Sequence, residues 1–133
     1  MAIYNVGLAH GGDRWTGNTI KCALLTAGYT IDVDHEDYAD ISGSESAATG
    51  YTTTGHAVTG RSVSVDNTND VSYLIADDVA FGALNSGSVR YAVLYDSTDD
   101  VLIRVIDFGT TRTLNGGTVT LRFTNNRVRT LTT

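Results

Sequence analysis

Few residues of this 133-residue chain have the types and spacing that catalysis needs. Its three histidines, His10, His35 and His56, do not have the spacing of metal ligands, and the sequence holds no G-x-S-x-G elbow and no phosphate-binding glycine loop. The adjacent carboxylates at positions 77–78 and 99–100 fall in predicted turns. Acidic residues are common in such solvated turns, so these pairs need no catalytic role. Paired carboxylates can also hydrolyse sugars, but the chain lacks the cluster of aromatic residues that would hold one. The sequence therefore predicts a protein that is not an enzyme and that needs no cofactor.

The densest group of charged side chains lies in residues 28–50, a long acidic excursion without Lys or Arg. The acids that we expect at an assembly interface are Asp32, Asp34, Glu36, Asp37 and Asp40. A calcium loop that started at Asp32 would need glycine at its sixth position and glutamate at its twelfth, where the chain has Asp37 and Gly43. No metal site is therefore predicted here, and His35 is expected to be a surface residue rather than a ligand.

Charge is divided unevenly along the chain. The formal net charge is −6, with 14 acids and 4 bases up to Asp100, and then 5 arginines against the single Asp107. A pI near 4.7 argues against nucleic-acid binding, which usually needs a net positive charge. Three basic residues near the carboxyl end, Arg122, Arg127 and Arg129, are expected to meet the acidic excursion of a neighbouring copy. The alternative is that these arginines are solvated on strand faces without a partner.

Two further side chains are chemically distinctive. Cys22 lies in the apolar run of residues 20–25, which predicts a small buried side chain, and as the only cysteine it can form no disulfide within the chain. Trp15, the only tryptophan, falls in a loop predicted over residues 9–18. So large an apolar group is expected to cap an edge of the core, and a ligand contact at the loop tip is the alternative.

The elements that must position these residues are β-strands. The chain contains no Pro or Gln, one Lys and two Glu, so residues that favour helices are rare. Thr, Val, Ile and Tyr suit a pleated surface that is buried on one side and wet on the other. Turn residues recur about every eight to twelve positions, as in all-β domains with many strands.

The pattern predicts where the strands lie. They are expected at residues 19–27, 51–54, 56–65, 71–76, 79–81, 88–96, 101–108, 118–124 and 128–131, after a short strand or arm at 1–8. Turns are expected at 66–70, 97–100, 115–116 and 125–126, with a short helical turn capped by Asp34 near 36–41. A common face is expected for Val89, Tyr91, Val93 and Tyr95. The strands at 19–27 and 101–108 are apolar on both faces, which predicts that both sides are covered.

These elements predict one all-β domain over residues 1–133, a two-sheet sandwich of jelly-roll type with about 8–10 short antiparallel strands. Its strand edges lack the Lys and Pro that usually protect them, so we expect other subunits to cover them. No apolar run approaches the roughly 18 residues of a membrane span, and residues 1–8 lack the features of a secretory signal. A soluble product of the cytosol, with no membrane partner, is therefore expected.

Ten stretches spread over nearly the whole chain are distinctive as a set: residues 1–8, Trp15, and residues 19–25, 29–41, 50–51, 58–60, 65–67, 76–79, 92–96 and 106–109. In these stretches the chain resembles a family of small virion proteins of tailed bacteriophages. The loop at 9–18 and the basic tail at 125–129 depart from the family's pattern. These motifs belong to the scaffold of the fold and not to an active site.

The resemblance implies a structural part of the particle, made in the cytoplasm of the host bacterium and carried on the virion head. By analogy with other small phage β-proteins, it implies a head decoration, or cement, protein that forms a homotrimer and bridges subunits of the major capsid protein. Two alternatives stay open. One is a module that binds carbohydrate or a host receptor at the virion surface, and the other is a component of the tail or connector.

Overall fold

The computed structural model describes residues 2–4, 7, 11–123 and 127–132, without the side chains of residues 127–132. Within these residues the chain forms eight strands and two short helices, so the fold is mostly β, as its composition predicts. The strands are β1 (Ala2–Ile3), β2 (Ile20–Leu25), β3 (His56–Ala57), β4 (Ser62–Asp66), β5 (Val71–Ile75), β6 (Val79–Asp96), β7 (Val101–Leu121) and β8 (Arg127–Thr132). The helices are α2 (Gly12–Gly17) and α3 (Ala39–Ser42).

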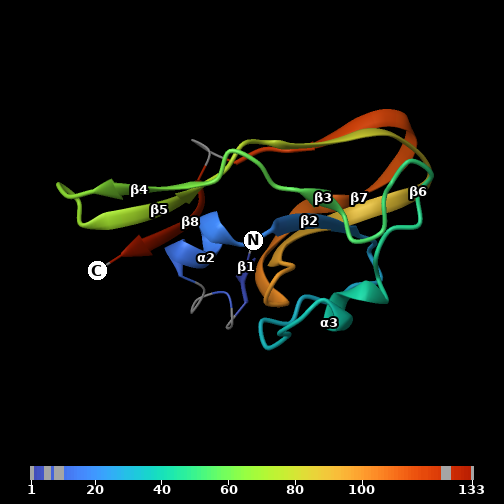
Figure 1. The fold of residues 1–133 in the computed structure, drawn as a ribbon. Coiled ribbons are helices and arrows are strands. Elements are labelled where there is room, and N and C mark those ends of the chain that lie inside the picture. The colour runs from blue at the N-terminus through green and yellow to red at the C-terminus, as the bar shows by residue number, and fades with distance from the viewer. Residues whose placement is uncertain (1, 5–6, 8–10, 124–126, 133) are drawn as a thin grey trace.

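The strands form two antiparallel sheets, as expected. The larger sheet has the order β1-β7-β6-β2-β3, and the smaller one has the order β4-β5-β8. In Figure 1 the smaller sheet extends to the left, away from the body that the larger sheet builds. The strand expected to be central, β2, lies between β6 and β3.

The two longest strands, β6 and β7, form one long hairpin that curls over the larger sheet (Figure 1). Their pairing changes register at five places, and such bulges bend a strand and increase its twist. Each of these strands is predicted from the sequence as two shorter ones, because the irregular stretches interrupt the alternation of apolar residues. The predicted turn at Asn115 and Gly116 is therefore wrong: Asn115 pairs with Asn85 inside the hairpin, and Gly116 has a φ of 91° within β7.

The larger sheet has an apolar cluster on each face. On β2, Ile20, Cys22 and Leu24 belong to one cluster, and Ala23 and Leu25 to the other. The prediction that this strand is covered on both sides is thus confirmed. We call these the arch cluster, which the curled hairpin covers, and the acidic-side cluster, which residues 29–41 cover.

One predicted face is wrong in part. Tyr91, Val93 and Tyr95 lie together in the acidic-side cluster, but Val89 packs in the arch cluster. The register shift between Val89 and Tyr91 is the physical reason, because one bulge reverses the alternation of faces.

Other boundaries differ from the prediction. Residues 51–54 form no strand, and the strand expected at 56–65 is broken into β3 and β4 around Gly60, whose φ is 64°. The predicted turn at 66–70 is confirmed, since the Asp66 carboxylate accepts the backbone N–H groups of Thr68 and Asn69. The turn expected at 125–126 lies outside the described residues.

Candidate assembly surfaces

The acidic excursion packs over one face of the larger sheet. Ile41 and Tyr29 are buried there, and Ile31 and Tyr38 pack against them. Two hydrogen bonds fix the segment to the start of β7 and to the turn before it: the N–H of Leu102 donates to the carbonyl of Glu36 at 2.9 Å, and the N–H of Tyr38 donates to Asp100 Oδ1 at 2.9 Å. The carboxylates face outward, because Asp32, Asp34, Glu36 and Asp40 are exposed and Asp37 is half-buried.

The helical turn in this segment is capped differently from the prediction. Helix α3 begins at Ala39, and Asp34 does not cap it: the N–H of Asp34 instead donates to Asp32 Oδ1. Asp40 closes the turn, since its Oδ2 accepts the N–H of Glu36 at 2.8 Å and that of Asp37 at 3.4 Å. These bonds favour the ionised carboxylate and lower the pKa of Asp40 below its usual value.

The change Asp40→Asn should therefore destabilise the protein near neutral pH and matter less in acid. A carboxylate whose pKa is lowered in the folded state contributes stability above its unfolded pKa of about 3.9, and this contribution is lost as the pH falls through the folded value. We expect the urea midpoint of the variant to lie below that of the original protein at about pH 7, and the difference to narrow towards about pH 3. Asp77→Asn is the control, because the exposed Asp77 carboxylate has no hydrogen-bond partner among the described residues. An equal difference at both pH values would contradict the assignment.

His35, expected to be a surface residue rather than a ligand, is only partly exposed and is held by neighbouring side chains. It is half-buried, and its Nδ1 lies 2.9 Å from the Tyr29 hydroxyl, which in turn lies 2.8 Å from the hydroxyl of the buried Tyr4. Its Nε2 lies 3.8 Å from Asp32 Oδ2. Burial raises the pKa of both tyrosines, so neither is poised to act as a base. This series of contacts fixes the acidic excursion to the sheet. No sequence motif predicts it.

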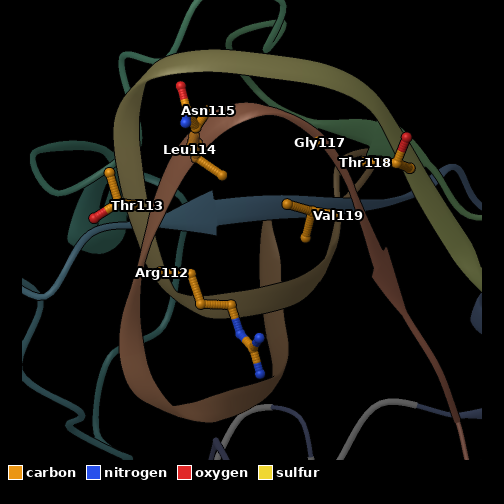
Figure 2. A pocket seen from close by; sticks show the side chains of 7 residues that line it. All are labelled: Arg112, Thr113, Leu114, Asn115, Gly117, Thr118 and Val119. Atoms are coloured by element: carbon orange, nitrogen blue, oxygen red, sulfur yellow. The ribbon is translucent and has the colours of Figure 1, made fainter.

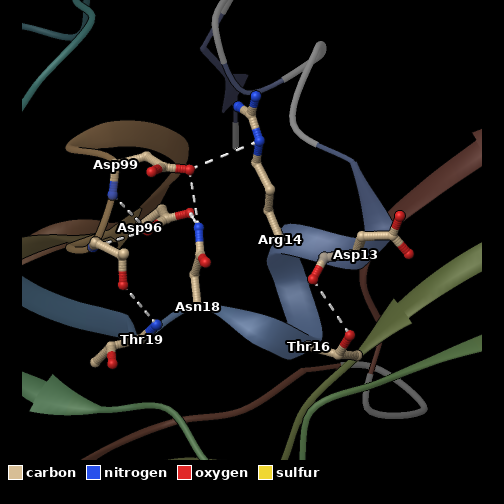
Figure 3. A network of polar contacts seen from close by, with 8 residues as sticks. Asp13, Arg14, Thr16, Asn18, Thr19, Asp96 and Asp99 are labelled. Atoms are coloured by element: carbon tan, nitrogen blue, oxygen red, sulfur yellow. Dashed lines mark hydrogen bonds and ion pairs between the residues drawn. The ribbon is translucent and has the colours of Figure 1, made fainter.

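A second polar network joins helix α2 to the turn between β6 and β7 (Figure 3). Asp96 is fully buried, and its Oδ1 accepts the N–H groups of Thr98 and Asp99 while its Oδ2 accepts Asn18 Nδ2 at 2.7 Å. Asp99 Oδ2 also accepts Asn18 Nδ2, at 2.9 Å, and lies 3.6 Å from Arg14 Nε. These contacts close the turn. Backbone N–H groups and the Asn18 amide bond the Asp96 carboxylate, and the same amide and Arg14 hold that of Asp99.

The smaller sheet offers an open strand edge. β4 lies at one end of its order and pairs only with β5 among the described residues. Two valines that share a face of β4, Val63 and Val65, are 40% and 63% exposed. The edge strands of the larger sheet, β1 and β3, are each two residues long, and so short an edge gives an incoming strand little to pair with. The bare edge expected from the sequence thus belongs to the smaller sheet.

A groove lies where β7 bends back on itself. Figure 2 shows one part of it, lined by residues 112–115 and 117–119, and a second part adjoins it along Phe108, Thr120 and Arg122. Each part has a volume of about 350 Å³, and both share Arg112, Thr118 and Val119. Phe108 and Val119 pack against the arch cluster, so they form the apolar wall of the groove.

The two arginines of the groove differ from others in the chain. Arg90 pairs with Asp107 at 3.1 Å, and Arg61 donates to the backbone carbonyl of Val58 at 3.0 Å. Arg112 lies over the Phe108 ring at 5.7 Å, and neither Arg112 nor Arg122 meets a carboxylate among the described residues. The groove therefore presents two guanidinium groups beside an apolar wall, an arrangement that suits an anionic partner.

The structure brings only part of the predicted interface together. The five acids lie on one segment, over the acidic-side cluster, whereas Arg122 lies at the groove beyond the arch cluster, on the other face of the sheet. The backbones of Arg127 and Arg129 lie in β8, and their side chains are outside the described part of the chain. Arg112 is not among the interface residues predicted from the sequence, and the curl of β7 brings it to the same groove as Arg122.

Trp15 does not stand at a loop tip. It lies in helix α2, where a loop was predicted, and its side chain is fully buried in the arch cluster. Its Nε1 donates to the carbonyl of Ile75 at 3.1 Å. A side chain so enclosed cannot offer its ring to a ligand. Of the two roles predicted for Trp15, the structure is therefore compatible with packing in the core and not with a ligand contact.

Within the part of the chain that the structure describes, no three His, Cys, Asp or Glu side chains gather as a metal site would require, and no helix is long and apolar enough to cross a membrane. Cys22 is buried, and burial raises the pKa of its thiol well above the usual range. Comparison of the chain with protein-family models, curated proteins and solved structures gives no match.

Proposed function

We propose that this chain is a structural subunit of a bacteriophage virion, a head decoration protein that binds the assembled shell and bridges neighbouring subunits of the major capsid protein. The observation that carries the proposal is the projecting sheet with its open β4 edge and its exposed Val63 and Val65. Native proteins usually protect such an edge, so one left bare is suited to accept a partner. The phage resemblance of the sequence supplies the kind of partner. The sandwich of jelly-roll type stays part of this proposal.

The docking mode that we propose is addition of a strand from the shell to the edge of β4. Backbone hydrogen bonds along β4 would supply affinity, and the two valines would pack against alternate side chains of the incoming strand. Repetition over the shell strengthens a modest single contact, because each further contact of a multivalent subunit becomes intramolecular. A homotrimer on the head surface would use three such edges at once.

The test is rebinding to particles that lack the protein. Purified protein should co-sediment with such particles and raise the temperature at which they release their DNA. Val63→Asp together with Val65→Asp should weaken binding by about a hundredfold, because two carboxylates would lose their water at the contact. The matched control places the same two charges at Thr52 and Thr53, which are exposed and lie outside both β4 and the acidic excursion.

Two outcomes would overturn the proposal. The first is that the original protein neither binds the particles nor protects them from heat. The second is that the valine variant binds as tightly as the control, which would leave the β4 edge without the role assigned to it.

A further inference from the structure

We propose that the acidic excursion of one copy docks into the β7 groove of a second copy, with Val33 against the apolar wall and the neighbouring carboxylates beside Arg112 and Arg122. This inference rests on the proposed function, since it names the contact by which decoration subunits would join one another. It assigns a role to a groove and to an exposed valine that the proposed docking of β4 leaves unused.

The groove provides one half of the match. Its wall is made by Phe108 and Val119, and its two guanidinium groups meet no carboxylate among the described residues. Thr118 and Thr120 also line this space, and a threonine hydroxyl can donate a hydrogen bond to a carboxylate. Guanidinium groups beside an apolar surface bind carboxylates well, because a planar guanidinium is weakly hydrated and offers several donors.

The acidic excursion provides the other half. Val33 is 39% exposed, and the described residues include only two other large apolar side chains that are so exposed, both on β4. It lies between Asp32 and Asp34 in the sequence, in a stretch that holds no Lys or Arg. An apolar side chain flanked by carboxylates is complementary to a groove that has an apolar wall and two arginines, because apolar surface meets apolar surface and opposite charges meet.

The two halves cannot meet within one copy. The excursion packs on the acidic-side cluster and the groove backs onto the arch cluster, and the larger sheet separates these clusters. Figure 1 shows the same separation, with α3 below the sheet and the curl of β7 above it. Contact between the two surfaces therefore joins different copies head to tail, and such contacts close into a ring when the rotation between copies allows it. A closed ring of three would be the homotrimer of the proposed function.

A charge-exchange experiment tests the contact. One variant carries Arg112→Glu and Arg122→Glu, and the other carries Asp34→Lys and Glu36→Lys; Asp32 is left intact because its carboxylate accepts the N–H of Asp34. In sedimentation velocity at low salt, each variant alone should associate at least about tenfold more weakly than the original protein. An equal mixture of the two should recover association, and added salt should weaken it.

Controls separate this inference from loss of folding and from failure of the proposed function. Arg14→Glu removes an exposed arginine outside the groove and should leave self-association unchanged. Circular dichroism checks each fold, and Arg112→Gln with Arg122→Gln replaces the glutamate variant if that one unfolds. Particle binding of every variant is measured in parallel.

Several results would overturn the inference. If the original protein binds particles but does not self-associate, or if the charge variants associate normally, the contact is wrong and the proposed function stands. If only the arginine variant loses particle binding, the groove takes an acidic surface of the shell instead of a second copy. If the original protein neither self-associates nor binds particles, both proposals fail.

Discussion

Replacing Trp15 with alanine should lower the free energy of unfolding by about 3–5 kcal/mol, the range found for large aromatic residues removed from a core. The side chain is fully buried and is the largest in the arch cluster. Its loss would leave a cavity and would also leave the carbonyl of Ile75 without the indole N–H that bonds it at 3.1 Å. Both effects act in the same direction.

Trp15 lies where the body of the protein meets the projecting sheet, so its loss should also weaken this junction. Helix α2 carries it, and Ile75 lies at the end of β5, so the indole connects the body of the protein to the projecting sheet. Arg61, just before β4, donates to the backbone carbonyls of both Trp15 and Asn18 and strengthens the same junction. We therefore expect the variant to hold the projecting sheet less firmly and to bind particles more weakly.

Urea unfolding followed by circular dichroism measures the effect. Val65→Ala is the control, because Val65 is 63% exposed and its truncation should cost less than about 0.5 kcal/mol. Trp15→Phe should fall between the two, since it keeps most of the apolar volume but removes the N–H donor. A loss below about 1 kcal/mol for Trp15→Ala would show that the ring is not enclosed as described.

The sequence predicts the centre of the fold well, for a simple physical reason. The run at residues 20–25 is apolar at odd and even positions alike, and only a strand covered on both faces can bury such a run. The turn at 66–70 was equally predictable, since Asp66 bonds the backbone of its own turn. Both signals are local, so tertiary contacts need not be known to read them.

The curl of the β6–β7 hairpin could not be predicted in the same way. Asn115 and Gly116 have the sequence of a tight turn, but tertiary packing uses them as a bulge opposite Asn85. Each bulge changes which face of the sheet a residue occupies, so Val89 packs on the opposite face from Tyr91 and Tyr95. Alternation of apolar residues predicts faces only as far as the next irregularity in the pairing.

Of the candidate surfaces, one could be predicted from the sequence and one could not, for the same reason. A count of charges was enough to find the acidic excursion, because its acids are contiguous in sequence. The groove escaped detection because Arg112 and Arg122 are ten positions apart, and only the bend of β7 brings them to one space. The glycines at 109, 116 and 117 were the available signal for that bend, and the positive φ of Gly109 and Gly116 marks where it occurs.

Replacing Glu45 with alanine should lower the free energy of unfolding by about 3 kcal/mol, since hydrogen bonds to a charged group contribute about 1.5–3 kcal/mol each. Its Oε1 accepts the Tyr38 hydroxyl, and its Oε2 accepts the Tyr51 hydroxyl together with the N–H of Thr54 at 2.8 Å. The Tyr51 hydroxyl also accepts the N–H of Leu24 at 3.1 Å. Glu45 therefore joins the acidic excursion to the central strand.

The geometry of Thr54 explains why a single carboxylate matters so much. Its φ is 80°, a conformation that a β-branched residue adopts only when its surroundings impose it. Glu45 holds its N–H, and the Tyr95 hydroxyl holds its carbonyl at 2.6 Å. Burial raises the pKa of Tyr95 to about 12, so this hydroxyl stays protonated and able to donate at any physiological pH.

The chain supplies a matched control for this prediction in its other glutamate, Glu36, which lies on the same excursion with its side chain exposed. Glu36→Ala should change the free energy of unfolding by less than about 0.5 kcal/mol, while Glu45→Ala should lower the urea midpoint clearly. Amide hydrogen exchange should then show faster exchange at Leu24 and Thr54, whose N–H groups lose their bonds to Tyr51 and Glu45. Equal effects of the two substitutions would refute the anchoring role.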